Sequence, residues 1–283
     1  MSERAAAPAE PAPAPSAEST AAASPGPILP GAAAPGAVTH CLLLSGGLDS
    51  TTLAAWIKVR HPGETVKAYT FLYGQKHVVE LEAARTVAKA FGMEHRVIEL
   101  PPIHGSALTD TDTALPEERD LATATGVAPS YVPARNLLFL AQMASLQDAF
   151  GPALLWLGVH HDDHTGYPDC RPEFVEAADQ AVRLGTQYQL RVQAPFVNWS
   201  KADIIRWGLE HGVPYELTHS CYQGRSPACG VCDTCQARLA AFAAAGETDP
   251  IPYEKRAGRA GAAGTGAVHA GPRGASAGAT GAW

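Results

Sequence analysis

The chain has 283 residues, of which 46% are hydrophobic, and it carries 21 Lys and Arg against 28 Asp and Glu, a formal net charge of −7. This acidic balance argues against a broad nucleic-acid surface built from Lys and Arg, although a few local donors can still hold a small anion. No apolar run approaches the roughly 20 residues of a membrane span, and the N-terminal region lacks the apolar stretch of a signal peptide, so we expect a cytoplasmic protein.

Both ends of the chain have a low-complexity composition. Residues 1–36 contain 13 Ala and 8 Pro, and residues 256–283 contain 8 Gly and 10 Ala. Such segments bury too little apolar area to offset the entropy of ordering them, so we predict two disordered tails. Between them we predict an α/β domain over residues 37–215 and a cysteine-rich segment over residues 216–255, packed on the same domain.

Short apolar runs alternate with segments of helical periodicity in the middle of the chain. We predict strands at 38–44, 65–73, 96–100, 154–159 and 189–194, and helices at 51–59, 78–91, 137–150, 173–184 and from Ser200, where Asp203 completes a capping box. This alternation predicts a doubly wound, mostly parallel five-stranded sheet of the Rossmann-like kind, with helices on both faces. Ligands of such sheets bind at the carboxyl ends of the strands. Residues 101–132 show little periodicity and form a long loop that is either functional or mobile.

A glycine-containing turn follows the first strand, where the chain reads Ser45-Gly46-Gly47-Leu48-Asp49-Ser50. The glycines let the backbone pass close to an anion, and the helix start behind them supplies unpaired N–H groups. An ordinary strand–turn–helix connection is the alternative. An acid here would repel phosphate unless Mg²⁺ lay between them, so Asp49 is assigned to metal binding or loop geometry. We predict a phosphate site formed by Leu44, Ser45, Gly46, Gly47, Leu48, Asp49, Ser50, Thr51, Thr52, Leu53 and Ala54.

Four of the six cysteines fall within 15 residues, at Cys221, Cys229, Cys232 and Cys235. A spacing of two residues lets two thiolates bind one ion, and four thiolates suit tetrahedral zinc. In a reducing cytosol such a cluster favours a metal over disulfides. We predict one structural Zn²⁺ per chain, with free thiols, a redox pair or an iron–sulfur cluster as alternatives. Cys41, inside the first strand, is expected in the core.

Further polar side chains come directly after predicted strands or before predicted helices. Each alone has a structural explanation, such as a helix cap or a solvated turn. Their grouping at strand ends predicts a substrate site. These residues are Tyr73, Gln75, His77, Arg135, Asn136, Asp162, Asp163, Tyr167, Asp169 and Lys201.

Taken in order, these segments resemble the 7-cyano-7-deazaguanine synthase family of the PP-loop ATP pyrophosphatase superfamily. The resemblance is carried by the loop at 45–50, Tyr73-Gly74-Gln75 with His77, Val132-Pro133 with Arg135-Asn136, Gly166-Tyr167-Pro168-Asp169-Cys170, and the cysteine cluster. It implies an adenine nucleotide alpha hydrolase-like fold with a C-terminal zinc-binding helical segment. It also implies an ATP-dependent carbon–nitrogen ligase of queuosine biosynthesis. Such an enzyme converts 7-carboxy-7-deazaguanine and ammonia to the nitrile through an adenylated carboxylate and an amide.

The resemblance further implies catalytic roles for Asp49, Arg135 and Lys201, ATP bound with Mg²⁺, and a homodimer with no nucleic-acid or membrane partner. The chain departs from the family pattern at Leu48, in a short loop before Cys229, and in a histidine-rich run at 160–164. Two alternatives remain. One is another PP-loop enzyme, such as an amide-forming ligase or a tRNA-modifying enzyme, for which Cys170 is the candidate persulfide carrier. The other is a zinc-ribbon binding module without catalysis.

Overall fold

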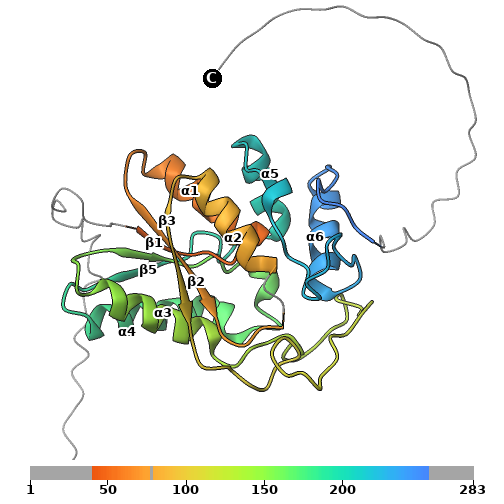
Figure 1. Ribbon diagram of the computed structural model, residues 1–283, viewed down its shortest axis with the longest axis horizontal. Helices are drawn as coiled ribbons and strands as arrows, with labels where there is room; N and C mark the ends of the chain where they lie inside the picture. The colour runs from red at the N-terminus through yellow and green to blue at the C-terminus, as the bar shows by residue number, and fades with distance from the viewer. Residues whose placement is uncertain (1–39, 77–78, 255–283) are drawn as a thin grey trace, which may run out of the picture. The chain divides into compact units, whose positions relative to one another are not determined.

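A five-stranded parallel sheet forms the centre of the computed structural model, which describes residues 40–76 and 79–254. Both predicted tails, and the predicted site residue His77, lie outside the described residues. The strands are β1 (His40–Leu43), β2 (Val66–Leu72), β3 (Glu94–Glu99), β4 (Leu154–Trp156) and β5 (Arg191–Gln193). They lie in the order β3-β2-β1-β4-β5, so the direction of winding reverses between β1 and β4 (Figure 1). The predicted sheet is confirmed, and the point of reversal is where such sheets bind ligands.

Helices cover both faces of the sheet, as predicted. Helices α1 (Leu48–Arg60), α2 (Val79–Ala90), α5 (Lys201–Glu210) and α6 (Asp233–Ala244) lie on one face, and α3 (Arg135–Gln147) and α4 (Pro172–Gly185) lie on the other (Figure 1). Three short 3₁₀ helices are η1 (His161–Asp163), η2 (Pro168–Cys170) and η3 (Tyr215–Leu217). Among the described residues, no helix is both long and apolar enough to cross a bilayer.

Successive side chains of β1 point to opposite faces of the sheet, so the strand contributes to two separate core clusters. Leu42 packs into the cluster under α1 and α5, whereas Cys41 packs into the cluster under α3, and both are fully buried. A strand buried on both faces must be apolar throughout, which is why the apolar run was recognisable. Cys41 is a core residue, as expected.

The first helix begins earlier than predicted. Gly47 has an extended backbone, with φ −81° and ψ 171°, and it is the N-cap of α1, so Leu48 is already helical rather than part of the turn. Gly47 has no side chain to cap this end, and no side chain in the described part of the chain bonds to the first N–H groups of α1. At α5 the predicted capping box is present, because Ser200 and Asp203 exchange side-chain to backbone hydrogen bonds.

The long loop 101–132 contains no helix or strand, as predicted, and it is packed against the rest of the protein. Leu108 and Val132 are buried in the core under α3. The N–H of Glu118 donates to the carbonyl of Val231 in the cysteine-rich segment over 2.9 Å. Arg119 lies nearby and pairs with Asp233 at the start of α6 over 2.6 Å. The loop is therefore anchored on a segment more than a hundred residues away in sequence.

A buried ion pair holds α6 to the chain on either side of it. Arg238 donates to both carboxylate oxygens of Asp249, over 2.7 Å and 2.9 Å, and also to Thr218 and the carbonyl of Tyr215. Phe242 on the same helix packs in the core with β1 and α1. The start of α6, which carries Cys235, is thus fixed relative to the sheet.

Candidate active site

A cavity of about 340 Å³ opens at the carboxyl ends of β1, β2 and β4. Its size falls within the range of ligand pockets. Thirteen of the predicted site residues line it: Leu44, Ser45, Gly47, Asp49, Ser50, Tyr73, Gln75, Arg135, Asn136, Asp162, Asp163, Tyr167 and Lys201. Others do not line it: Gly46, Leu48, Thr51, Thr52, Leu53, Ala54 and Asp169.

Two serine hydroxyls fix the loop after β1. Ser50 Oγ accepts from the N–H of Ser45 over 3.2 Å and lies 3.1 Å from Ser45 Oγ, which in turn accepts from the N–H of Gly47. Thr51 and Thr52 are fully buried, and their hydroxyls donate to the carbonyls of residues 47 and 48 one turn earlier. The serines therefore face the cavity, whereas the threonines stabilise the helix behind it.

Gly46 brings the loop into direct contact with α2. Its backbone has φ +82°, and a Cβ at this position would lie 2.5 Å from both the carbonyl oxygen of Glu80 and the N–H nitrogen of Ala84. Only glycine accommodates this conformation and this approach together. Gly46 thus shapes the loop and positions the first turn of α2 beside it.

An ion pair joins the loop to α5. Lys201 Nζ lies 2.8 Å from Asp49 Oδ2, and His160 Nε2 lies 3.7 Å from the same oxygen and 3.2 Å from Asp163. Burial alone would raise the pKa of Asp49, but Lys201 and His160 together lower it below its usual value. Burial likewise opposes the charge of Lys201, yet the neighbouring carboxylates raise its pKa. Both groups are therefore charged at neutral pH.

Arg135, the first residue of α3, faces the cavity from the opposite side of the sheet. It donates to Tyr73 Oη over 3.0 Å, and its guanidinium lies 5.7 Å from the centre of that ring. The next residue, Asn136, is held by Asp169, whose carboxylate accepts from the N–H of Asn136 over 2.9 Å. Asp169 therefore caps the first turn of α3, which carries Arg135. The Asp169 side chain itself does not line the cavity.

Gln75 also has a structural role, because it supports the backbone that carries Tyr73. Its carbonyl oxygen accepts from the N–H of Tyr73 over 2.7 Å, and its amide donates to the carbonyl of Phe71. Both polar ends are used by the backbone at the end of β2, so Gln75 holds the turn in which Tyr73 stands.

The cavity is also lined by residues that were not predicted from sequence, among them Glu80, His160 and Tyr222. Burial is the largest cause that raises the pKa of Glu80, to about 7, with Arg135 acting in the opposite direction. Tyr222 lies 3.4 Å from Tyr167, whose hydroxyl also contacts Ser130. Position at a strand end was the available signal for Glu80 and His160, since they follow β2 and β4.

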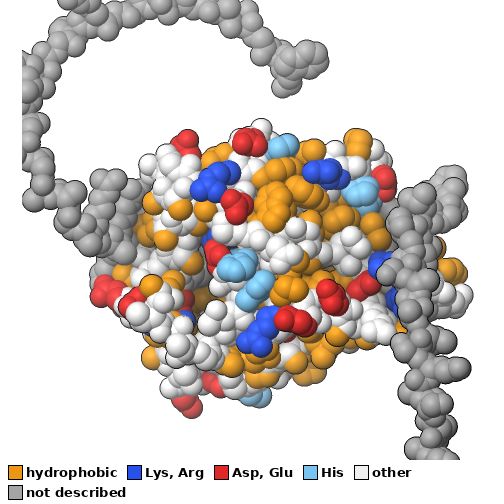
Figure 2. Space-filling model, turned by 180° about the vertical axis from the view of Figure 1, so that it is seen from behind, with side chains coloured by type: hydrophobic (Ala, Val, Ile, Leu, Met, Phe, Trp, Pro, Cys, Tyr) orange, Lys and Arg blue, Asp and Glu red, His pale blue; other side chains and the backbone are white. Residues whose placement is uncertain are grey.

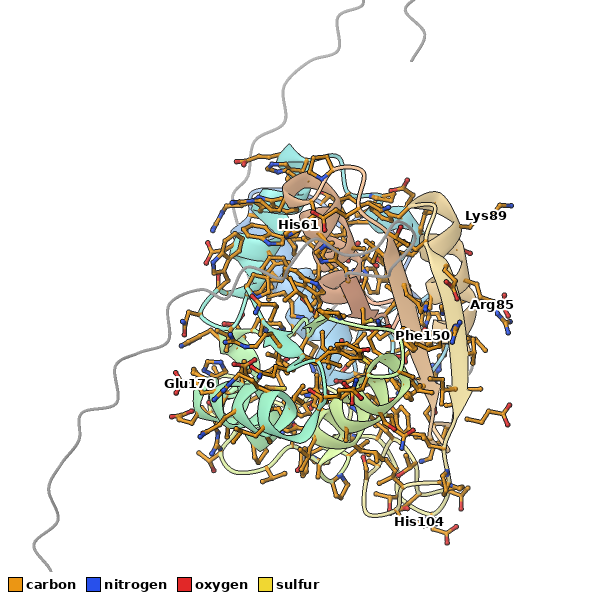
Figure 3. The ribbon with its side chains drawn as sticks, turned by 90° about the vertical axis from the view of Figure 1, so that its left-hand side faces the viewer. His61, Arg85, Lys89, His104, Phe150 and Glu176 are labelled. Carbon is orange, nitrogen blue, oxygen red and sulfur yellow. The ribbon has the colours of Figure 1, made fainter. Side chains whose placement is uncertain are left out.

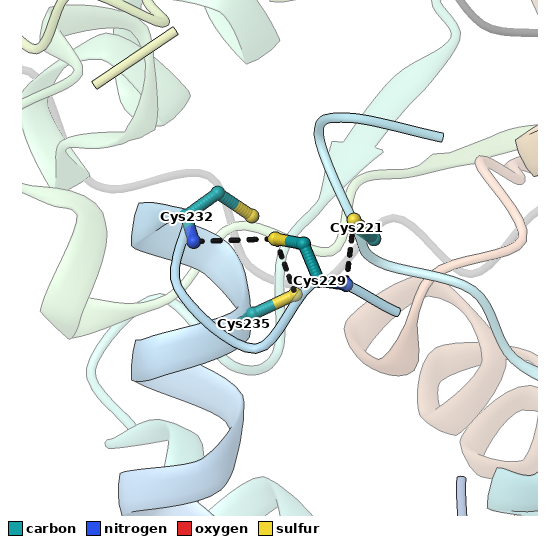
Figure 4. A group of neighbouring side chains, drawn as sticks. All are labelled: Cys221, Cys229, Cys232 and Cys235. Atoms are coloured by element: carbon teal, nitrogen blue, oxygen red, sulfur yellow. Dashed lines mark hydrogen bonds between the residues drawn. The ribbon is translucent and has the colours of Figure 1, made fainter. Parts of the chain in front are cut away.

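The four clustered cysteines are buried together, as Figure 4 shows. Their sulfur atoms all lie within 4.8 Å of one another, and Cys229 Sγ is 3.9 Å from Cys235 Sγ. Tetrahedral zinc with bonds of about 2.3 Å requires sulfurs about 3.8 Å apart. Backbone N–H groups of Val231 and Cys232 approach Cys229 Sγ at 3.5 Å and 3.4 Å, which supports a thiolate. The group fits a metal ion such as zinc.

A second group of potential ligands, His40, His61 and Glu64, lies at the far end of β1. His61 and the loop residue His104 mark opposite ends of the strands in Figure 3. Trp156 donates its indole N–H to His40 Nδ1 over 3.0 Å, so the proton of the neutral ring sits on Nε2 and is donated to Glu64 over 2.6 Å. A metal at Nε2 would displace this proton, and we interpret the group as structural.

Comparison with known proteins agrees with this geometry. The family model described as "Queuosine biosynthesis protein QueC" matches residues 39–246. The chain belongs to the QueC family. It is 44% identical over 221 residues to 7-cyano-7-deazaguanine synthase from Acinetobacter baylyi, which covers 75% of this chain and 93% of that protein. It is 46% identical over 222 residues to 7-cyano-7-deazaguanine synthase from Azotobacter vinelandii, which covers 75% and 96%.

The resemblance inferred from the ordered motifs is therefore confirmed, and with it a place in queuosine biosynthesis. The solved structure of NMN synthetase from Francisella tularensis superposes with a TM-score of 0.42 at 15% identity, over 75% of this chain and 79% of that one. A likeness at this level adds nothing to the QueC assignment.

Proposed function

We propose that this QueC-family chain is an ATP-dependent carbon–nitrogen ligase that converts 7-carboxy-7-deazaguanine and ammonia to 7-cyano-7-deazaguanine. Its relatives carry the name of that synthase. The observation that carries the proposal is the convergence of the loop at 45–50, Lys201 and Arg135 on one cavity. N–H groups at a helix start and two fixed cations suit a triphosphate and a carboxylate together.

The first step activates the substrate. A carboxylate oxygen attacks the α-phosphorus of ATP, the bond between the α- and β-phosphates breaks, and pyrophosphate leaves. The loop serines and the start of α1 would hold the phosphates, and Lys201 and Arg135 would offset the negative charge that develops. Ammonia then displaces AMP from the carboxyl carbon and loses one proton, which gives the amide.

The second step removes the remaining oxygen. The amide oxygen is adenylated by a second ATP, because an amide oxygen is a poor leaving group and a phosphate ester is a good one. Loss of AMP and of the two protons on nitrogen leaves the nitrile. One cavity can serve both steps, since each needs the same phosphates, the same cations and an oxygen at the same carbon.

Two metals belong to the proposal. Zinc would be held by Cys221, Cys229, Cys232 and Cys235, where it would stabilise the fold with no ligand position left open for chemistry. Magnesium supplies charge neutralisation on the phosphates of ATP. Asp49 Oδ1 is buried and has no hydrogen-bond partner among the described residues, and Asp49 is the residue that would hold this ion.

Purified protein incubated with 7-carboxy-7-deazaguanine, ammonium and MgATP tests the proposal. Mass spectrometry should show the amide and then the nitrile, with AMP and pyrophosphate rather than ADP and phosphate. Lys201→Met should lower the rate about 10²-fold or more, because one preorganised charge contributes about that much. Lys89→Met, at the exposed end of α2 (Figure 3), is the matched control and should leave the rate unchanged. Absence of both products from the wild type would refute the proposal.

A persulfide mechanism, as in a tRNA-thiolating enzyme, is less well supported. Burial raises the pKa of the Cys170 thiol, and Asp163 and Asp169 raise it further, so the thiolate that such chemistry needs is disfavoured. Acidic and basic side chains are interspersed over the face in Figure 2, which supports a small-molecule substrate over tRNA. Cys170→Ala should retain nitrile formation.

The remaining parts of the proposal are a homodimer, a cytoplasmic location and no nucleic-acid or membrane partner. The molar mass measured by light scattering after size-exclusion chromatography tests the homodimer. Consumption of ATP in the assay above separates a ligase from a zinc-ribbon binding module, which would consume none.

A further inference from the structure

Five carboxylates line the cavity, and one of them differs from the rest. Four have a partner within the described residues: Asp49 with Lys201, Asp162 with the N–H of residue 201, Asp163 with His160, and Asp233 with Arg119. The fifth is Glu80, whose carboxyl forms no hydrogen bond and no ion pair within 4.0 Å among the described residues. A half-buried carboxyl that lines a cavity and has no protein donor keeps both oxygens available to accept hydrogen bonds from a ligand.

Glu80 is held firmly where it stands. It lies in the first turn of α2, and its carbonyl oxygen is in the close contact with Gly46 described above. Its position is therefore fixed relative to the phosphate loop. The cation that acts on its carboxyl is Arg135, which lines the cavity from the start of α3.

Glu80 and Arg135 face the same cavity and do not form an ion pair with each other. Arg135 uses one of its N–H groups on Tyr73, so others are available to a ligand. A ligand that carries an acceptor beside two donors would satisfy both side chains together. The guanine-like edge of a 7-deazaguanine is such a ligand, because it presents a carbonyl oxygen, a ring N–H and an exocyclic amino group in a row.

We infer that Glu80 accepts the ring N–H and the 2-amino group of the deazaguanine base, and that Arg135 donates to its carbonyl oxygen. The inference rests on the proposed function, since it names the residues that select the base of that substrate. Two parallel N–H···O bonds to one carboxylate are short and directional, so they provide specificity as well as affinity.

The pKa of Glu80 is consistent with its proposed role as the acceptor of two hydrogen bonds from the base. Burial raises its pKa to about 7, against Arg135, which lowers it, and the Cys221 sulfur, which adds a smaller rise. Donors on a bound base favour the charged form. Binding of the base therefore favours the carboxylate, which gains two charge-assisted hydrogen bonds.

The test compares two substrates in two proteins. The substrates are 7-carboxy-7-deazaguanine and its analogue without the 2-amino group, and the readout is kcat/KM for pyrophosphate release with ammonium at saturation. Wild-type protein should prefer the parent by about 10²-fold or more, because the analogue leaves an acceptor oxygen of Glu80 unpaired in the complex. Glu80→Gln should lower kcat/KM for the parent substrate by about 10²-fold as well, mainly by raising KM. It should also reduce the preference for the parent over the analogue to less than about tenfold.

Glu82→Gln is the matched control, since this carboxylate lies on the exposed side of the same helix and should preserve the preference. The preference is a ratio within one protein, so partial misfolding of a variant does not alter it. Glu80→Asp should keep an intermediate preference. An unchanged preference in Glu80→Gln would overturn the inference, as would equal losses for both substrates. If wild-type protein releases no pyrophosphate with either base, the proposed function itself fails.

Discussion

Replacing Gly46 with Ala tests whether the loop after β1 and helix α2 press against each other as described. The new Cβ would lie 2.5 Å from two backbone atoms of α2, and φ is +82°. The left-handed conformation costs a non-glycine residue about 1–2 kcal/mol. Overpacking against atoms that cannot rotate away costs about 1–3 kcal/mol more. We expect Gly46→Ala to lower the free energy of unfolding by about 2–5 kcal/mol.

Gly63 separates the two contributions. It has the same φ of +82°, and a Cβ there would meet nothing within 4 Å. Gly63→Ala should therefore lose only the conformational part, about 1–2 kcal/mol. The difference between the variants, about 1–3 kcal/mol, isolates the steric contact.

Thermal and urea unfolding of the two variants measure this difference. At about 2–4 °C for each kcal/mol in a chain of this size, Gly46→Ala should unfold about 2–12 °C below Gly63→Ala. It should also lose ATP turnover, because the loop must move to relieve the contact, whereas Gly63→Ala should keep it. Equal unfolding temperatures would show that α2 does not constrain the loop at Gly46.

Three further results are expected. Arg238→Met leaves Asp249 as a buried unpaired charge and should cost about 3–5 kcal/mol in urea unfolding, and a loss under 1 kcal/mol would contradict the buried pair. Lys201→Met should be less stable than wild type at neutral pH. Because the folded pKa of Asp49 is depressed, its contribution is present above the ordinary value of 3.8 and is lost as pH falls through the folded value. The difference in stability between wild type and Lys201→Met should therefore become smaller in acid. A difference that does not depend on pH would refute the pairing of Asp49 with Lys201. Cys235→Ser should lower both the metal content, measured by plasma mass spectrometry, and the unfolding temperature, and an unchanged metal content would exclude this thiol as a ligand.

Much of the sheet could be predicted because β1 and its neighbours are buried on both faces, which demands short apolar runs. The helix boundaries were harder to predict from the sequence. Gly47 reads as a turn residue, yet its extended backbone caps α1, so the helix starts at Leu48 instead of Thr51. A glycine N-cap leaves no polar side chain to mark the start of a helix.

The site was predictable in location and less so in detail. Position at the start of a predicted helix placed Arg135 and Lys201 correctly in the cavity. It could not show that Thr51 bonds back to its own helix, since a threonine hydroxyl serves a ligand or the preceding turn equally well. Nor could it show that Asp169 caps α3, because that contact joins residues 33 positions apart. The isolation of Glu80 is likewise a property of its tertiary surroundings.

The anchoring of the long loop on the cysteine-rich segment has a mechanical consequence. Arg119 and Asp233 both line the cavity, and the latter stands directly beside Cys232. We therefore expect occupancy of the thiol cluster and binding at this wall of the cavity to be energetically linked, and linkage of this kind is reciprocal. A substrate that binds more tightly when the ion is present will raise the affinity for the ion by the same factor, so a chelator should remove less metal at equilibrium from the substrate-saturated protein than from the free protein.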